Sequence, residues 1–198
     1  MRGTSIRGKS MSRFAVATLL CLFLAPPVLG APIINDSARG QKLDELFQRL
    51  KTAPTQSSAL EAEQQISAIW LQSGDPDIDE QMRLAMQAMD ELYYGSALKV
   101  FSNILVLRPD YAEAWNKRAT LYYLVGNYQE ALNDIERVLA LEPRHFGAIA
   151  GKGMVMLKLA RPEEALAAFK QALAVDPALT SIQTEVHMLE IQLGDKRG

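Results

Sequence analysis

The sequence has few of the residues from which catalytic and metal sites are built. Its 198 residues include one cysteine, Cys21, and two histidines, His145 and His187. Cys21 lies in a segment that we expect to be removed, so the rest of the chain can form neither a disulfide nor a thiolate metal site. His145 closely follows a helix-ending proline, and we expect it at a surface junction. We therefore predict no metal site and no cofactor.

Phosphate loops and hydrolase motifs are absent as well. The glycines between residues 147 and 153 fall within an expected helix and match no nucleotide-binding fingerprint. The sequence contains no Gly-x-Ser-x-Gly motif. The aspartates between residues 75 and 79 lack the glycine and the distal glutamate of a calcium-binding loop, so we interpret them as helix caps. The sequence therefore predicts that this protein is not an enzyme.

An excess of basic residues is also missing. The chain has 21 lysines and arginines against 23 aspartates and glutamates, a net charge of -2. Four of the basic residues and no acidic residue lie in residues 1–30, which leaves 17 against 23 and a net charge of -6 for the remainder. Binding to nucleic acid needs a basic surface that can neutralise phosphates. We therefore predict no nucleic-acid partner.

One apolar run stands out, and it is short. Residues 14–25 form a run of 12 residues, preceded by basic residues and followed by Pro26 and Pro27. A membrane-spanning helix needs about 20 residues, whereas this order of segments is typical of a secretory signal peptide. We expect residues 1–30 to be a signal peptide cleaved near Gly30 or Ala31, and the protein to be periplasmic without stable membrane insertion. A membrane anchor that stays attached is the alternative.

The rest of the chain is dominated by an internal repeat. A small residue, a large apolar residue and a proline each recur at an interval of 34. These residues are Ala97, Ala131 and Ala165; Phe101, Ile135 and Phe169; and Pro109, Pro143 and Pro177. A repeat of this length is typical of a stacked array of helical hairpins. We predict an all-α fold with units at residues 78–111, 112–145 and 146–179.

Other segments flank the three units. Residues 31–39 are expected to be a flexible leader. Residues 40–77 have two amphipathic helical patterns separated by Pro54, and we interpret them as a degenerate hairpin that is either a member of the array or a cap on its first face. Residues 180–198 are predicted to be a capping helix and tail, with one apolar face that covers the last unit and one polar face that meets water.

The middle unit resembles the tetratricopeptide repeat (TPR) family. The resemblance lies in its large, small and turn positions, namely Trp115, Ala119, Tyr122, Gly126-Asn127, Ala131, Ile135 and Pro143. The first unit departs from the pattern, because Leu92 falls where the turn glycine is expected. The resemblance implies a right-handed α-α superhelix whose first helices line a concave face. It also implies a structural ion pair between Arg118 and Asp134, and a function in binding proteins or peptides.

The concave face is the candidate site. Its expected inner positions are Met82, Met86 and Met89 in the first unit, Asn116, Thr120 and Tyr123 in the second, and Ala150, Met154 and Leu157 in the third. Methionine adapts to irregular partners, and tyrosine is a frequent anchor at interfaces. Some of these methionines could instead pack between units. We predict no clamp for a terminal carboxylate, because Gly147 and Gly151 fall where cations would be needed.

These observations favour a non-enzymatic adaptor or assembly factor that holds a protein or peptide in the concave face. One alternative is a holdase, a chaperone that binds apolar segments of several clients through the same residues. Another is an architectural subunit that uses its convex or terminal faces. Self-association is compatible with each hypothesis. The sequence does not identify the partner.

Overall fold

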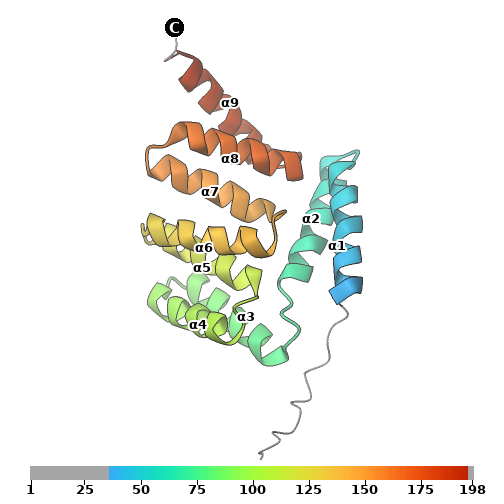
Figure 1. The fold of residues 1–198 in the computed structure, drawn as a ribbon, viewed down its shortest axis with the longest axis vertical. Helices are drawn as coiled ribbons and strands as arrows, with labels where there is room; N and C mark the ends of the chain where they lie inside the picture. Colours follow the sequence, from blue (N-terminus) through green and yellow to red (C-terminus); the bar gives the residue numbers. More distant parts are fainter. Residues whose placement is uncertain (1–35, 196–198) are drawn as a thin grey trace, which may run out of the picture. The chain divides into compact units, whose positions relative to one another are not determined.

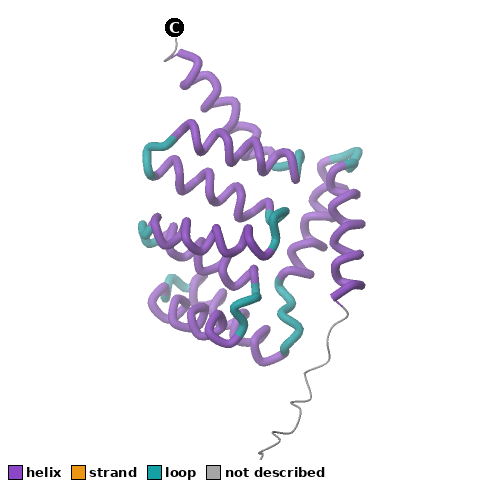
Figure 2. Tube along the Cα trace, viewed as in Figure 1, coloured by secondary structure: helices purple, strands orange, loops and turns teal. Residues whose placement is uncertain are grey.

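The computed structural model describes residues 36–195, and within this range the chain forms nine α-helices and no β-strand (Figures 1 and 2). The helices are α1 (Asp36–Lys51), α2 (Gln56–Trp70), α3 (Pro76–Asp90), α4 (Tyr94–Leu107), α5 (Ala112–Leu124), α6 (Tyr128–Leu141), α7 (Phe146–Lys158), α8 (Pro162–Val175) and α9 (Thr180–Asp195). None of these helices is long and apolar enough to span a membrane. The predicted signal peptide lies outside the described residues.

The three predicted units are the helix pairs α3–α4, α5–α6 and α7–α8, and the all-α superhelical fold is confirmed. The alanines that recur at an interval of 34 on the second helices have no exposed surface. The large residues four positions later are buried as well, with exposed fractions of 0% for Phe101, 3% for Ile135 and 0% for Phe169. The small residue lets the two helices of a unit approach closely, and the large one fills the adjacent space.

The helix boundaries follow from local chemistry. Pro76 and Pro162 occupy the first turns of α3 and α8, where a missing amide donor costs nothing. The carboxylate of Asp75 accepts hydrogen bonds from the backbone amides of Asp77 and Ile78, and that of Asp79 accepts one from Ser73 at 2.7 Å. Two of the aspartates between residues 75 and 79 therefore bond to backbone amides where α3 begins, as expected for helix caps.

The turns inside the three units share one backbone conformation. Leu92, Gly126 and Ala160 stand 34 residues apart, and their φ angles are 64°, 80° and 55°. Only glycine adopts this left-handed region without strain, so Leu92 and Ala160 hold conformations that cost an L-residue roughly 1–2 kcal/mol. The first unit therefore has the same turn as the other two, with Leu92 in place of the expected glycine.

We expect Leu92→Gly and Ala160→Gly each to raise the free energy of unfolding by about 1 kcal/mol, because each replacement removes this strain. Urea denaturation followed by circular dichroism measures the effect. Gly126→Ala is the matched control. An added Cβ there would meet no atom within 4 Å, so any loss of stability would come from the backbone alone. A destabilised Leu92→Gly variant would contradict the interpretation.

The ion pair expected within the middle unit is present. The guanidinium of Arg118 donates two hydrogen bonds to the Asp134 carboxylate, with both N···O distances at 2.8 Å. A third hydrogen bond, of 3.2 Å, runs from Arg118 Nη1 to the hydroxyl of Ser102 on α4. Arg118 therefore joins both helices of its unit to the unit before, and its role is structural.

The hairpin formed by α1 and α2 does not lie where we expected. Its apolar core includes Phe146 of α7, and Val175, Ala178 and Leu179 pack against it. It therefore lies across the loops that join successive units, α4–α5, α6–α7 and α8–α9, instead of stacking on α3 and α4 as a member or cap of the array (Figures 1 and 2). The α6–α7 and α8–α9 loops contact the hairpin itself, and the α4–α5 loop contacts the linker that follows it.

Each inter-unit loop contributes to this interface. At the α6–α7 loop, the Trp70 ring stacks on the His145 ring with centroids 4.0 Å apart, and Arg144 pairs with Asp44 at 2.6 Å. At the α8–α9 loop, the side-chain amide of Gln56 donates to the Ala178 carbonyl at 2.9 Å. The α4–α5 loop holds the linker between α2 and α3.

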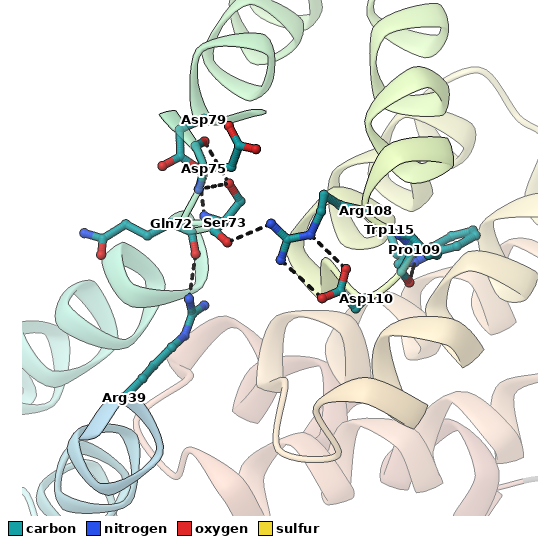
Figure 3. Close-up of polar contacts among 9 residues, drawn as sticks. All are labelled: Arg39, Gln72, Ser73, Asp75, Asp79, Arg108, Pro109, Asp110 and Trp115. Carbon is teal, nitrogen blue, oxygen red and sulfur yellow. Dashed lines mark hydrogen bonds and ion pairs between the residues drawn. The ribbon is translucent and has the colours of Figure 1, made fainter. Parts of the chain in front are cut away.

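Figure 3 shows this linker between two arginines. Arg39 of α1 donates to the carbonyls of Ile69 and Gln72, at 2.9 and 2.7 Å, and Arg108 donates to the Ser73 carbonyl at 3.2 Å. Arg39 falls in the expected flexible leader, but α1 already begins at Asp36. Its bonds to the C-terminal end of α2 explain why the helix starts earlier than the sequence pattern indicates.

Candidate binding surface

The first helices of successive units present one surface. α3 contacts α5, and α5 contacts α7. Eight residues on α3, α5, α7 and α9 occupy two equivalent positions that repeat at an interval of 34, and we call them the first-helix strip. They are Met86, Thr120, Met154 and Met188 at one position, and Met89, Tyr123, Leu157 and Ile191 at the other. All eight are partly or fully exposed.

One predicted surface residue is instead part of the core. Met82 is only 2% exposed and packs in a cluster with Ile78, Ala85 and Phe101. Its side chain therefore cannot contact a partner, and its assignment to the groove was wrong. Met86 and Met89 pack against the same cluster but keep part of their surface exposed. The alternative of packing between units thus applies fully to Met82 and partly to the other two.

The predicted residues of the second and third units remain accessible. Thr120 is exposed, and Asn116, Tyr123, Ala150, Met154 and Leu157 are partly exposed. The Thr120 hydroxyl donates to the Asn116 carbonyl one turn earlier, at 3.0 Å. The Tyr123 ring lies 5.8 Å from that of Tyr128, centroid to centroid. Tyr123 is therefore held by a neighbouring aromatic ring while part of its surface stays free.

The strip continues onto α9, which the sequence pattern did not lead us to predict. Met188 and Ile191 on α9 are 59% and 49% exposed. We had expected α9 to be a cap with a polar outer face, but these two apolar side chains lie on its exposed surface. The interval of 34 would have identified them, because they follow Met154 and Leu157 at the same spacing. The strip therefore spans four helices.

A buried polar cluster borders the strip at α5. His145 is 3% exposed, which corrects its expected place at the surface, and its Nε2 lies 2.9 Å from Glu113 Oε2. His145 Nδ1 accepts a hydrogen bond from the Ala148 amide, so Nε2 carries the proton that is donated to Glu113. Lys117 Nζ lies 3.0 Å from Glu113 Oε1, and the Asn116 amide donates to Glu113 at 3.2 Å.

Electrostatics fix the charge of this cluster. Burial by itself would raise the pKa of the Glu113 carboxyl, but the His145 and Lys117 side chains outweigh that effect and hold the pKa below its usual range. The charge of Lys117 is therefore compensated by a buried carboxylate. Lys117 is the cation of the second unit that could meet a peptide carboxylate, and its charge is already engaged within the protein.

A shallow pocket lies away from the strip, between α1 and the C-terminal end of α8. It encloses about 450 Å³ and is lined by Asp44, Phe47, Gln48, Lys51, Arg144, Ala174 and Val175. The Arg144 guanidinium lies over the Phe47 ring, 4.3 Å from its centroid, and pairs with Asp44 and Glu142. Its charge serves to hold the hairpin. The described residues contain no group of three or more potential metal ligands.

Comparison with known proteins identifies relatives of the repeats. The sequence model of the tetratricopeptide repeat matches residues 112–145, and a second model of the same repeat matches residues 147–179. A TPR repeat-containing protein from Rhizobium etli is 37% identical over 161 residues, which cover 81% of this chain and 79% of that protein.

Solved structures are similar in fold. The Yersinia enterocolitica type III secretion chaperone SycD, in complex with a peptide of the translocator YopD, has a TM-score of 0.57 at 14% identity, covering 60% of this chain and 95% of that one. The first TPR of Spaghetti (RPAP3), bound to the HSP90 peptide SRMEEVD, has a TM-score of 0.57 at 17% identity, covering 59% and 93%. These identities are too low to indicate more than a shared fold.

Proposed function

Because the chain belongs to the tetratricopeptide repeat family, we propose that it is a non-catalytic scaffold that binds a protein or peptide segment along the first-helix strip. The observation that carries the proposal is the strip itself, a row of accessible, mainly apolar side chains repeated on four helices. Structural neighbours with bound peptides, among them SycD and the first TPR of Spaghetti, support this use of the fold.

The chemistry of the strip favours an apolar partner segment. Methionine side chains adapt to irregular surfaces, and a partly buried tyrosine can serve as an anchor. A segment recognised through its terminal carboxylate would need free cations on the first helices. The charge of Lys117 is engaged by Glu113, and Gly147 and Gly151 leave the third unit without a cation at the corresponding positions. We therefore propose recognition of apolar side chains within the segment.

Site-specific photo-crosslinking in cells tests this function. A photoreactive residue at Thr120, which is exposed on the strip, is compared with one at Asn133, which is exposed on the second helix of the same unit. One dominant protein crosslinked from position 120 and absent from position 133 supports an adaptor. A broad set of clients at position 120 supports the holdase alternative. Equal crosslinking from both positions would contradict binding along the strip.

The proposal includes export to a periplasm, supported by the order of segments in residues 1–30. Purification from the periplasmic fraction followed by N-terminal sequencing tests it. A mature N-terminus at Ala31 or Pro32 is expected. An uncleaved protein in the membrane fraction would instead support the retained anchor.

We expect Tyr123→Ala to weaken binding of the crosslinked partner by about tenfold, because it removes an aromatic anchor from the centre of the strip. Lys117→Ala is expected to change the Kd by less than about threefold, since its ammonium is engaged by Glu113. Isothermal titration calorimetry with the purified partner measures both values. Equal losses in the two variants would count against an apolar strip.

A further inference from the structure

The turns inside the three units form the edge of the array that lies away from the α1–α2 hairpin (Figures 1 and 2). Two of these turns expose large apolar side chains. They are Leu92 and Tyr93, between α3 and α4, which are 69% and 63% exposed, and Leu124 and Val125, where α5 ends, which are each 50% exposed. We call these four residues the turn-edge patch. None of them belongs to the first-helix strip.

The turn of the first unit has two features that are unfavourable for its own stability. Leu92 has a φ of 64°, in the left-handed region that disfavours an L-residue. Asp90 and Glu91 lie at the C-terminal end of α3, where the helix dipole disfavours negative charge. The turn itself requires neither feature, because the second unit has Gly126 in the same turn and α7 ends at Lys158. Local strain of this kind is typical of residues that serve a function.

The charge along this edge changes in a regular order. Asp90, Leu124 and Lys158 are the last residues of α3, α5 and α7, and they stand 34 residues apart. All three are exposed, and within residues 36–195 neither the aspartate nor the lysine forms an ion pair. The edge therefore runs from a negative through an apolar to a positive side chain. A row in this order is complementary to the same row in the opposite direction.

We propose that the turn edge is an interface with a second copy of this chain, related to the first by a twofold axis. An axis at Leu124 places Asp90 of each copy opposite Lys158 of the other, as a twofold contact requires. The two copies of Leu124 and Val125 then cover each other at the centre. The interface thus has an apolar centre with charged pairs at its rim, the usual arrangement for protein–protein contacts.

The neighbouring position of the turn is compatible with the same arrangement. Tyr93 and Arg161 occupy equivalent places in the first and third units, 68 residues apart. The twofold rotation brings the tyrosine of one copy towards the arginine of the other, and a guanidinium can bind the face of a tyrosine ring. Arg161 is paired with Glu164 within its own chain and can keep this partner.

We expect a weak dimer, with a Kd of about 10–100 µM, because the patch has only four apolar side chains and interfaces this small are usually transient. Sedimentation equilibrium of the exported protein between about 1 µM and 1 mM measures the Kd. The first-helix strip is a separate set of residues, so the inference holds whichever partner the strip binds. A protein that stays monomeric at 1 mM would overturn the proposal.

Charge reversal tests the direction of the pairing. Lys158→Asp places carboxylates opposite each other at both ends of the interface, and we expect it to raise the dimer Kd by about tenfold. Adding Asp90→Lys to the same chain restores opposite charges, and the Kd is expected to return to within about threefold of the original value. If the double variant were as weak as the single one, the antiparallel arrangement would be wrong.

Leu92→Gly separates dimerisation from folding. The replacement relieves backbone strain and is expected to stabilise the fold, as stated above, but it also removes an apolar side chain from the patch. We therefore expect it to raise the dimer Kd by about threefold to tenfold. Ala160→Gly relieves the same strain with the loss of one methyl group and is expected to change the Kd by less than about twofold. A Kd unaffected by Leu92→Gly would contradict a role of this side chain in the interface.

Disulfide crosslinking locates the axis. With Cys21→Ser as background, a single cysteine introduced by Leu124→Cys lies next to its own copy and is expected to form a disulfide-linked dimer under mild oxidation. Leu141→Cys, at the end of α6 on the opposite edge, is the control, since Leu141 is also apolar and 45% exposed. Equal crosslinking from both positions would place the contact between copies elsewhere and overturn the proposal.

Discussion

Trp70→Ala is expected to lower the free energy of unfolding by about 3–5 kcal/mol, the usual cost of removing a buried tryptophan. Trp70 is 6% exposed and contacts three rings, those of His145, Phe146 and Phe47, with centroids 4.0, 5.2 and 6.0 Å away. Two of these rings belong to the array and one to α1. The substitution therefore removes packing within the hairpin and also its main contact with the α6–α7 loop. Chemical denaturation followed by circular dichroism measures the loss.

Trp115→Ala is the matched control. Trp115 is partly exposed, its indole N–H donates to the Pro109 carbonyl at 3.0 Å, and the guanidiniums of Arg118 and Arg137 lie 4.9 and 5.9 Å from its ring centroid. We expect a smaller loss, about 2 kcal/mol, because less apolar surface leaves the core. If Trp70→Ala cost no more than Trp115→Ala, the hairpin would contribute little to the stability of the array.

The repeated part of the fold could be predicted because the two helices of every unit pack in the same way. The helices of a unit cross at a small residue such as Ala97, and a large residue such as Phe101 fills the space toward the next unit. Because the units stack regularly, a fixed interval in the sequence corresponds to a fixed step along the array. Residues at one interval must then occupy equivalent positions. The same interval of 34, counted from Met154 and Leu157, gives Met188 and Ile191 on α9.

The position of the hairpin could not be predicted in this way. The apolar stripe on α1 indicates that Leu43, Leu46 and Leu50 are buried, but it does not say against which element. That choice depends on contacts such as Trp70 with His145, between residues that have no periodic relationship. His145 was expected at the surface for the same reason, since nothing in its neighbourhood in the sequence points to a tryptophan from α2.

Which of the predicted groove residues are buried also could not be read from the repeat pattern. Met82 occupies the same position in its unit as Asn116 in the next, yet it packs under Phe101 and Ile78 and is lost from the surface. Asn116 is partly exposed, and its amide donates to Glu113, whose carboxylate is also hydrogen-bonded to His145. The hairpin thus influences the accessible chemistry of the strip through a contact that the repeat pattern does not contain.

Gly153→Ala is expected to lower the free energy of unfolding by about 2–3 kcal/mol through overpacking. A Cβ at Gly153 would overlap the ring of Phe169, at 2.5 Å from Cδ1 and closer still to Cε1. Phe169 has no exposed surface, so its ring cannot move aside without disturbing the core between α7 and α8. The other two units have alanine at this position, Ala85 and Ala119. In the third unit the Phe169 ring occupies the space that the methyl group would need.

Gly151→Ala, two residues earlier on α7, is the control that separates packing from helix propensity. A Cβ there would lie 3.8 Å from Ile135 Cδ1, an ordinary contact, so the substitution should raise the free energy of unfolding by about 0.5–1 kcal/mol through the better helix propensity of alanine. The two alanine variants differ only in position, and their thermal midpoints should move in opposite directions. If both were stabilising, Phe169 would not approach α7 this closely in solution. The glycine at position 153 would then need another explanation.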